Sequence, residues 1–284
     1  MVTRARAQTR LKTAGLEYGR PEGFRMEYSD FEFKIPVEEP DYAECSAEVT
    51  KSIESIIEEA IQSGRNKIFI NTNLRLGLPM ENINKIAGPF VEAWAFEVFY
   101  DELNNSNSPY RLVNVETKAR LHMADVILQF QRKRDRGDSV TAEVDVKATA
   151  EDIANSGKSP NITSYNRIRS AYVNDPDYMF IILSLKHRVY SKRNDVSALM
   201  DGIMEVVGHN AYDLKYVAKS DISYNPALGS GQIQIRDIHY IGHEYRTAWE
   251  FCQILDAKFL NSSRRNITEW EITAKKCGWI KNED

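Results

Sequence analysis

The sequence predicts a mixed α/β fold, because helical and strand-like segments follow one another without regular alternation. Apolar residues recur at helical spacing in residues 41–63 and 244–260, whereas residues 140–148 alternate strictly between apolar and polar side chains. The chain has 284 residues, of which 42% are hydrophobic and 27% are charged. This length and composition can supply one sizeable core, so we expect one large domain, or one domain with a small appendage.

The first hundred residues predict an arm followed by helical regions. Residues 1–40 contain several Arg, Gly and Pro residues and show no clear period, so we expect an N-terminal arm with little regular structure. Residues 41–63 form a predicted helix, and residues 67–71 a short strand. The helical pattern of residues 80–103 meets Pro89. Because proline disrupts a helix interior, a second helix is predicted to begin there.

The remaining elements follow from the same two periods and from clusters of turn residues. The most apolar run, residues 178–190, is expected to be a buried central strand. In chain order, the predicted elements are strands at residues 110–117, 121–130 and 140–148, a loop at 153–161, a helix at 162–173, the strand at 178–190, a helix at 196–207, a loop at 225–231, a strand at 232–240, a helix at 244–260, and a last short helix that opens with a Thr268–Glu271 capping box and ends near Gly278.

One face of the strand at residues 140–148 carries a row of charge. Glu143, Asp145 and Lys147 share that face, and Asp125 lies in the strand that a charged turn joins to it. Two neighbouring carboxylates repel each other unless a cation joins them. Mg²⁺ favours one or two carboxylates with water and a substrate phosphate, and a lysine on the same face would reach a phosphate oxygen or an attacking water. This is the layout of metal-assisted phosphodiester hydrolysis, but the spacing alone favours the alternative, which is an exposed hairpin with an ordinary charged face.

Glu92 is a candidate further acid. It begins an apolar stripe on the helix predicted after Pro89, so its side chain is expected at the interior or at a cleft edge. The alternative is that its charge is simply placed well against the helix dipole. Glu97 lies on a more polar face and is expected to be solvated.

Net charge, apolar runs, cysteines and histidines limit the classes of function that the sequence can have. The net charge of −4 and the pI near 5.9 argue against a generic nucleic-acid binder, but not against an enzyme with a small basic cleft. No apolar run is long enough for a membrane span, and the N-terminal residues lack the apolar segment of a secretory signal. Cys45, Cys252 and Cys277 have no metal-binding spacing, which predicts reduced thiols in a cytosolic protein. His239 and His243 straddle a predicted strand end, so we interpret them as ordinary surface or core histidines.

Four stretches resemble the core of the PD-(D/E)xK nucleases, and more specifically the HincII- and EcoRV-type type II restriction endonucleases. They occur in the family's order and span about residues 87–260, with HincII the more similar. They are AGPFVEAWAFEVF at 87–99, ADVILQ at 124–129, VDVKATAEDIANSGKSPNITSY at 144–165, and QIQIRD at 232–237 followed by the Trp249 helix.

The resemblance implies a restriction-endonuclease-like core, in which helices flank a central mixed β-sheet. It divides a single endonuclease domain at 41–284 into a catalytic core at about 87–190 and a DNA-recognition and C-terminal helical part at about 191–284. It also implies Mg²⁺-dependent cleavage of double-stranded DNA at a short palindrome with 5′-phosphate ends. The enzyme would be a homodimer without membrane contact, in a bacterial or archaeal cytoplasm.

The resemblance also implies roles for individual residues. Asp125 and Asp145 would bind the metal together with the backbone carbonyl of Val146, Lys147 would be the active-site lysine, and Glu92 would be a further catalytic acid. Ala124 replaces the proline of the family's name, a departure that HincII-type enzymes share. A second departure, Glu143, leaves open which of the acids bind the metal.

The DNA-contact residues implied by the resemblance lie in two loops and one helix. Lys158, Ser159 and Asn161 occupy a loop that resembles the family's DNA-contacting loop, Asn225 lies in a second base-reading segment, and Arg167 is a candidate phosphate contact. Asn can pair with an adenine edge and Lys with guanine, although each residue could also be an ordinary polar loop residue.

Further basic residues are candidate phosphate contacts, namely Arg132, Lys133, Arg134 and Arg169. The competing functions are a PD-(D/E)xK repair or junction-resolving nuclease, which would recognise DNA structure, and a non-catalytic DNA-binding module. The presence of Asp125, Asp145 and Lys147 together argues against the non-catalytic module.

Overall fold

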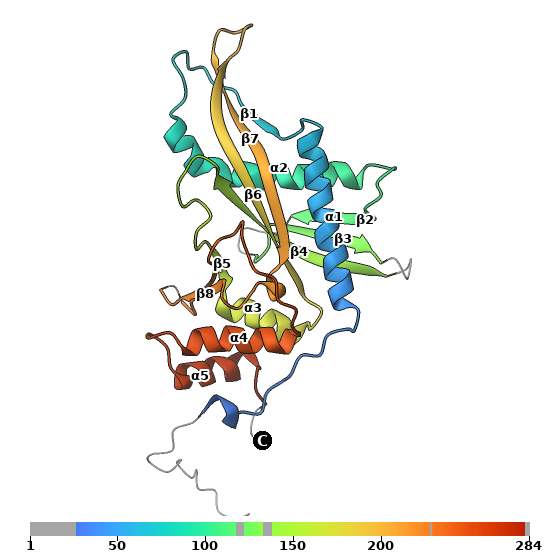
Figure 1. The fold of residues 1–284 in the computed structure, drawn as a ribbon, viewed down its shortest axis with the longest axis vertical. Helices are drawn as coiled ribbons and strands as arrows, with labels where there is room; N and C mark the ends of the chain where they lie inside the picture. The colour runs from blue at the N-terminus through green and yellow to red at the C-terminus, as the bar shows by residue number, and fades with distance from the viewer. Residues whose placement is uncertain (1–26, 118–121, 133–137, 228, 282–284) are drawn as a thin grey trace, which may run out of the picture.

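A computed structural model describes residues 27–117, 122–132, 138–227 and 229–281 (Figure 1). Most of the predicted N-terminal arm, and Lys133 and Arg134, lie outside the described residues. The helices are α1 (Tyr42–Gln62), α2 (Met80–Leu103), α3 (Tyr165–Asn174), α4 (Ala248–Leu260) and α5 (Ile267–Cys277), with short 3₁₀ helices η1 (Tyr28–Asp30) and η2 (Leu214–Tyr216). The strands are β1 (Lys67–Ile70), β2 (Leu112–Thr117), β3 (Val126–Gln131), β4 (Ser139–Ala150), β5 (Asn161–Ser164), β6 (Met179–Arg193), β7 (Met200–Asp213), β8 (Ile222–Asn225) and β9 (Gln232–Ile235).

The strands of the described residues form two sheets. The larger has the order β1-β7-β6-β4-β3-β2, and the smaller has the order β5-β9-β8. In the larger sheet β4 and β6 are parallel and the other neighbours are antiparallel. The predicted mixed α/β fold, with a central mixed sheet flanked by helices, is therefore confirmed.

Two apolar clusters cover opposite faces of the larger sheet. Alternate residues of β6 point to opposite faces. Ile181 and Leu183 join the cluster that contains α1 and α2. Phe180 and Ile182 join the cluster that contains α3, α4, α5 and the smaller sheet. Figure 1 shows α3, α4 and α5 gathered at one end of the molecule, while β6 and β7 extend beyond the body at the other.

The described part of the predicted arm packs onto the C-terminal helices. Phe31 and Phe33 lie against the ring of Trp270, with centroids 5.2 and 5.9 Å away. Phe33 also forms an isolated β-bridge with Ile280.

The predicted helix at residues 196–207 is wrong, because most of this segment belongs to β7. A register with β6 runs from Ile181↔Asp213 to Arg193↔Met200. Apolar side chains are buried on successive positions of β7, including Ile203 and Met204, so both faces of the strand are covered there. Such a doubly covered run has no period of two, so its sequence is ambiguous between a strand and a helix.

The predicted break before Pro89 is also wrong, since α2 continues through it. Proline removes one N–H donor from the helix, a loss that tertiary packing can outweigh. Ala87, Val91 and Ala95 are fully buried on either side of Pro89. This packing holds the helix continuous where the local sequence favours a break.

Three smaller boundaries differ from the prediction. The predicted helix at 162–173 begins later, at Tyr165, because residues 161–164 pair with β9 and Ser164 caps α3. The predicted strand at 232–240 ends at Ile235. The last helix is capped by the side chain of Asn266, not by a Thr268 capping box, and it does end beside Gly278, which adopts the left-handed conformation.

Arg169 is buried, and it cannot contact DNA in this structure, contrary to the sequence interpretation. Its guanidinium and the carboxylate of Asp256 are 0% and 1% exposed, with Nε 3.1 Å from Oδ1. Tyr28 and Tyr165 donate hydrogen bonds to the same carboxylate. In the described part of the chain, no helix has the length and apolarity needed to cross a bilayer.

We expect Asp256→Asn to destabilise the protein by about 3–5 kcal/mol, because it leaves the Arg169 charge buried without a counter-charge. The free energy of unfolding from denaturant titration measures this loss. The matched control is Asp101→Asn, which removes the partner of exposed Arg65 and should cost less than about 1 kcal/mol. Equal small losses in both variants would contradict a structural role for the buried pair.

Candidate active site

The end of the β3–β4 pairing creates an open strand edge beside Asp125. The register between these strands stops at Val126↔Val144, while β4 continues to Ala150. The Asp125 amide still donates to the Val144 carbonyl, but the Val146 amide donates to Asp125 Oδ2 at 2.8 Å. Since the N–H and C=O of one strand residue point to the same side, the Val146 carbonyl faces the edge on which Asp125 lies.

Asp145 lies between Val144 and Val146 on β4, and it is 4% exposed. Its Oδ1 accepts a hydrogen bond from Lys147 Nζ at 2.6 Å, and its buried Oδ2 has no hydrogen-bond partner in the structure. Burial raises the pKa of Asp145 to about 7 despite the opposing charge of Lys147, and Asp125 and Glu92 raise it further. A buried acid with one unpartnered oxygen is a site that an added cation would stabilise.

Glu92 approaches this pair of acids from α2. Burial and then the charge of Asp125 raise the pKa of Glu92, whereas Lys147 lowers it. The structure thus brings the four predicted catalytic side chains, Glu92, Asp125, Asp145 and Lys147, within electrostatic range of one another. Glu97, on the same helix, is exposed, as expected.

Glu143 has partners of its own on the same face of β4. The Tyr178 hydroxyl donates to Glu143 Oε2, and His122 Nε2 lies 3.8 Å from Oε1. The sequence interpretation missed both partners, because each is distant from Glu143 in the chain and neither carries a motif.

The donor set of this site suits a hard divalent cation. It offers the carboxylates of Asp125 and Asp145, with Oδ2 of Asp145 lacking a partner, and the edge-facing carbonyl of Val146. Among the described residues, no group of three or more His, Cys, Asp or Glu side chains is arranged to hold a metal. Two carboxylates, completed by water and substrate phosphate, are sufficient for Mg²⁺.

The predicted DNA-contact loop lies against the smaller sheet. Asn161 starts β5, and Gln234 of the central strand β9 donates to both the Ser159 carbonyl and Asn161 Oδ1, at 3.0 and 2.9 Å. Lys158 forms an ion pair with Asp237 and is 52% exposed. Asn155, Gly157 and Ser159 all have positive φ values, of 66°, 86° and 48°. Strained backbone of this kind concentrates at functional sites.

The other two predicted DNA-contact residues flank this sheet. Asn225 ends β8, pairs with Gln232 of β9, and accepts a hydrogen bond from the Ala227 amide. Arg167 is exposed in the first turn of α3, which follows β5 directly. The loop, β8 and α3 therefore meet around one small sheet, although they are far apart in the sequence.

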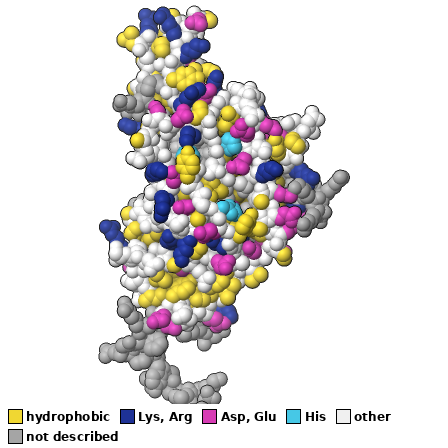
Figure 2. Space-filling view, viewed as in Figure 1, with side chains coloured by type: hydrophobic (Ala, Val, Ile, Leu, Met, Phe, Trp, Pro, Cys, Tyr) yellow, Lys and Arg dark blue, Asp and Glu magenta, His cyan; other side chains and the backbone are white. Residues whose placement is uncertain are grey.

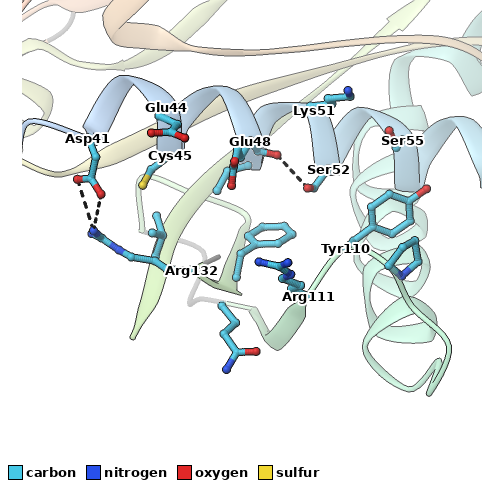
Figure 3. Close-up of a pocket in the computed structure, with 15 residues that line it drawn as sticks. Asp41, Glu44, Cys45, Glu48, Lys51, Ser52, Ser55, Tyr110, Arg111 and Arg132 are labelled. Atoms are coloured by element: carbon cyan, nitrogen blue, oxygen red, sulfur yellow. Dashed lines mark hydrogen bonds and ion pairs between the residues drawn. The ribbon is translucent and has the colours of Figure 1, made fainter. Parts of the chain in front are cut away.

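Several basic side chains elsewhere form ion pairs, among them Arg65, Arg188 and Lys215. On the face drawn in Figure 2, Lys and Arg are interspersed with Asp and Glu, without one continuous basic stripe. Arg132 forms ion pairs with Asp41 and Asp138, at 3.2 and 3.1 Å. It lies at one end of a cavity of about 290 Å³ between α1 and the ends of β3 and β4, which none of the four catalytic candidates lines (Figure 3).

Comparisons with known proteins match the chain to type II restriction enzymes. A family model described as type II restriction endonuclease HpaI matches residues 29–278. The type II restriction enzyme HpaI of Haemophilus parainfluenzae is 54% identical over 257 residues, which cover 90% of this chain and 100% of that protein. Among solved structures, the NlaIV restriction endonuclease has a TM-score of 0.39 and 13% identity, with 79% of this chain and 87% of that chain covered.

The two sequence matches identify the chain as a type II restriction endonuclease, which is a site-specific deoxyribonuclease. Within that class it belongs to the HpaI family. The predicted enzyme class is therefore confirmed, and the alternative of a non-catalytic DNA-binding module is not supported.

The raised pKa of Asp145 predicts a pH-dependent stability in the absence of metal. Between its ordinary pKa of 3.8 and about 7, the folded state holds a proton that the unfolded state has released, so stability falls as pH rises through this window. With EDTA, Asp145→Asn should therefore be more stable than the wild type at pH 8, by on the order of 2–4 kcal/mol, and equal to it near pH 4. Denaturant unfolding at several pH values tests this.

The matched control is Glu97→Gln, an exposed acid on α2, which should shift the curve equally at all pH values. A difference between Asp145→Asn and the wild type that does not change between pH 4 and 8 would contradict the assignment.

Proposed function

We propose that the protein cleaves double-stranded DNA at a short palindromic sequence in a Mg²⁺-dependent reaction that leaves 5′-phosphate and 3′-hydroxyl ends. The observation that carries this proposal is the open edge of β4, where Asp125, Asp145 and Lys147 converge and one buried oxygen of Asp145 is unpartnered. Membership of the HpaI family supports the same substrate class.

The acidic residues of the site would bind the cation, and the lysine would contact the attacking water and the phosphate. Asp125, Asp145 and the Val146 carbonyl would hold the cation, which when bound neutralises the scissile phosphate and acidifies a water molecule. Lys147, now paired with Asp145 Oδ1, carries an ammonium that can orient the attacking water and stabilise negative charge on the phosphoryl oxygens. Glu92, whose pKa is raised, would exchange a proton at the same edge.

The exposed groups around the smaller sheet would read the DNA. Lys158 and Asn161 offer a donor for guanine and a bidentate partner for adenine, while Ser159 and Asn225 supply further polar contacts. Arg167, exposed at the start of α3, would contact a phosphate. Gln234 already fixes Asn161 and Ser159 relative to each other, which favours a defined reading geometry.

A palindromic site calls for a two-fold symmetric homodimer, because each chain offers one site and each strand must be cut once. We place this dimer in the cytoplasm, where the DNA that a restriction system cleaves is found.

Digestion of plasmid or phage DNA tests the proposed reaction. With Mg²⁺ the wild type should produce discrete fragments, which EDTA and Asp145→Ala abolish, because charge on the scissile phosphate is then uncompensated. Lys147→Ala should reduce the rate about 100-fold or more. Glu97→Gln is the control and should cut normally. End sequencing should give one palindrome and 5′-phosphates, and a smear of fragments would instead indicate cleavage without sequence recognition.

The proposed base contacts predict a loss of discrimination. Lys158→Ala should weaken binding to the cognate duplex by about 1–3 kcal/mol and reduce the preference for it over a duplex with one substituted base pair. Fluorescence anisotropy without Mg²⁺ measures both. Lys192→Ala, at the exposed far end of β6, is the control and should leave discrimination unchanged. If both variants weaken all duplexes equally, Lys158 contributes only general charge.

A further inference from the structure

The segment Asp237–His239 lies between the predicted DNA-contact loop and the catalytic strand. His239 uses both ring nitrogens, with Nε2 at 2.5 Å from Thr149 Oγ1 of β4 and Nδ1 at 2.7 Å from Ser184 Oγ of β6. Both hydroxyl residues are buried, at 5% and 0% exposure. The imidazole therefore joins the two parallel strands at the centre of the larger sheet.

The hydroxyls of Thr149 and Ser184 lie on the face of the larger sheet that also carries Glu143, Asp145 and Lys147. Thr149 follows Lys147 by two residues on β4, so the two side chains point to the same face. Ser184 is the register partner of Lys147 on β6, and side chains of neighbouring strands in register also share a face. His239 is thus hydrogen-bonded to Thr149, which follows Lys147 on this face of β4, and to Ser184, which lies beside Lys147 on β6.

With a neutral His239 ring, each of these hydrogen bonds has one donor and one acceptor. Thr149 can donate to the Leu185 carbonyl, 3.5 Å away, and accept from the Nε2–H of His239, while Ser184 donates to Nδ1. Burial, followed by the charge of Lys186, lowers the pKa of His239, which favours this neutral form.

The same segment holds the DNA-contact loop. Asp237 accepts from Lys158 through one carboxylate oxygen and from the His239 amide through the other. The Ile238 amide donates to the Gly157 carbonyl at 3.0 Å. Gly157 packs so closely that an added Cβ would lie 3.2 Å from Thr149 and 3.3 Å from His239.

The backbone of the segment is anchored from behind by β7. Tyr212 Oη donates to the Ile238 carbonyl at 3.0 Å, and Asn210 Nδ2 donates to the His239 carbonyl at 3.2 Å. These two hydrogen bonds hold the carbonyls of the segment, whereas its amides face Asp237 and Gly157 and the side chain of His239 ends on Thr149 and Ser184.

We propose that His239 is a positioning residue that couples DNA contact by the loop at Lys158 to the placement of Lys147 on β4. The proposal rests on the proposed nuclease function. A DNA group that binds the Lys158 ammonium competes with the carboxylate of Asp237. When the Lys158 ion pair is broken, Asp237 keeps only its hydrogen bond from the His239 amide. The imidazole transmits the resulting shift to the row that contains Lys147.

Single-turnover cleavage and DNA binding, measured separately, test this coupling. His239→Ala should reduce the single-turnover rate at saturating cognate DNA about 10- to 100-fold, the size expected for a small misplacement of catalytic groups. The dissociation constant for the same duplex without Mg²⁺ should stay close to that of the wild type. His239→Gln, whose amide can bond both hydroxyls, should recover most of the lost rate.

His243→Ala is the matched control, because His243 is exposed and contacts the rings of Tyr216 and Tyr245 instead. Wild-type rates in His239→Ala would overturn the proposal, as would a parallel loss of binding, cleavage and melting temperature that His239→Gln does not restore. Both results differ from failure of the nuclease function itself, in which the wild type does not cleave.

Discussion

The parallel pairing of β4 with β6 is the constraint on which the rest of the structure depends. Parallel neighbours cannot be joined by a tight turn, so the chain must leave the sheet after Ala150 and return at Met179. That crossover contains the predicted DNA-contact loop, β5 and α3. This one connection joins the parallel strands β4 and β6, and its strand β5 forms an edge of the smaller sheet. It also contains the candidate base-reading residues Lys158, Ser159 and Asn161, which are therefore not on β4 itself.

The same pairing explains why the candidate catalytic residues Asp125, Asp145 and Lys147 lie at an open strand edge and yet on a firmly paired strand. β6 holds β4 from Ala142 to Ala150 on one side, while β3 leaves it after Val144 on the other. Beyond that point the Val146 amide donates to Asp125 and the Ala150 amide donates to Ser156 Oγ, while the Val146 carbonyl faces the same edge. Carboxylates fixed to a central strand hold their geometry better than carboxylates on a loop.

Local patterns in the sequence were sufficient where an element is covered on one face or defined by near neighbours. The alternation of β4 predicted its face of acids and lysine, and the helical spacing of α1 and α4 predicted both helices to within a few residues. The acid–acid–lysine group also follows local spacing, since Asp125 and Asp145 lie on the two strands of one hairpin.

Interactions between distant residues account for what the sequence could not predict. β7 looked helical because its partner strands, not its own period, decide its structure. Arg169 looked like a phosphate contact because its counter-charge, Asp256, is 87 residues away. His239 looked ordinary because Thr149 and Ser184 lie 90 and 55 residues from it. For Arg169 and His239 the deciding contacts join segments far apart in the chain, whereas β7 pairs both with its sequence neighbour β6 and with the distant strand β1.

Burying Asp145 beside another acid has an energetic cost that the rest of the domain must offset. The second apolar cluster, with Trp270, Trp279, Phe251 and Phe259 fully or almost fully buried, covers the sheet face that also carries Asp145. Its core contains the Arg169–Asp256 pair, and the hydroxyls of Tyr28 and Tyr165 donate hydrogen bonds to the carboxylate of that pair. At the edge of β4, by contrast, Asp145 is buried beside Asp125 with one oxygen unpartnered, so a cation and a DNA phosphate would gain free energy by binding there.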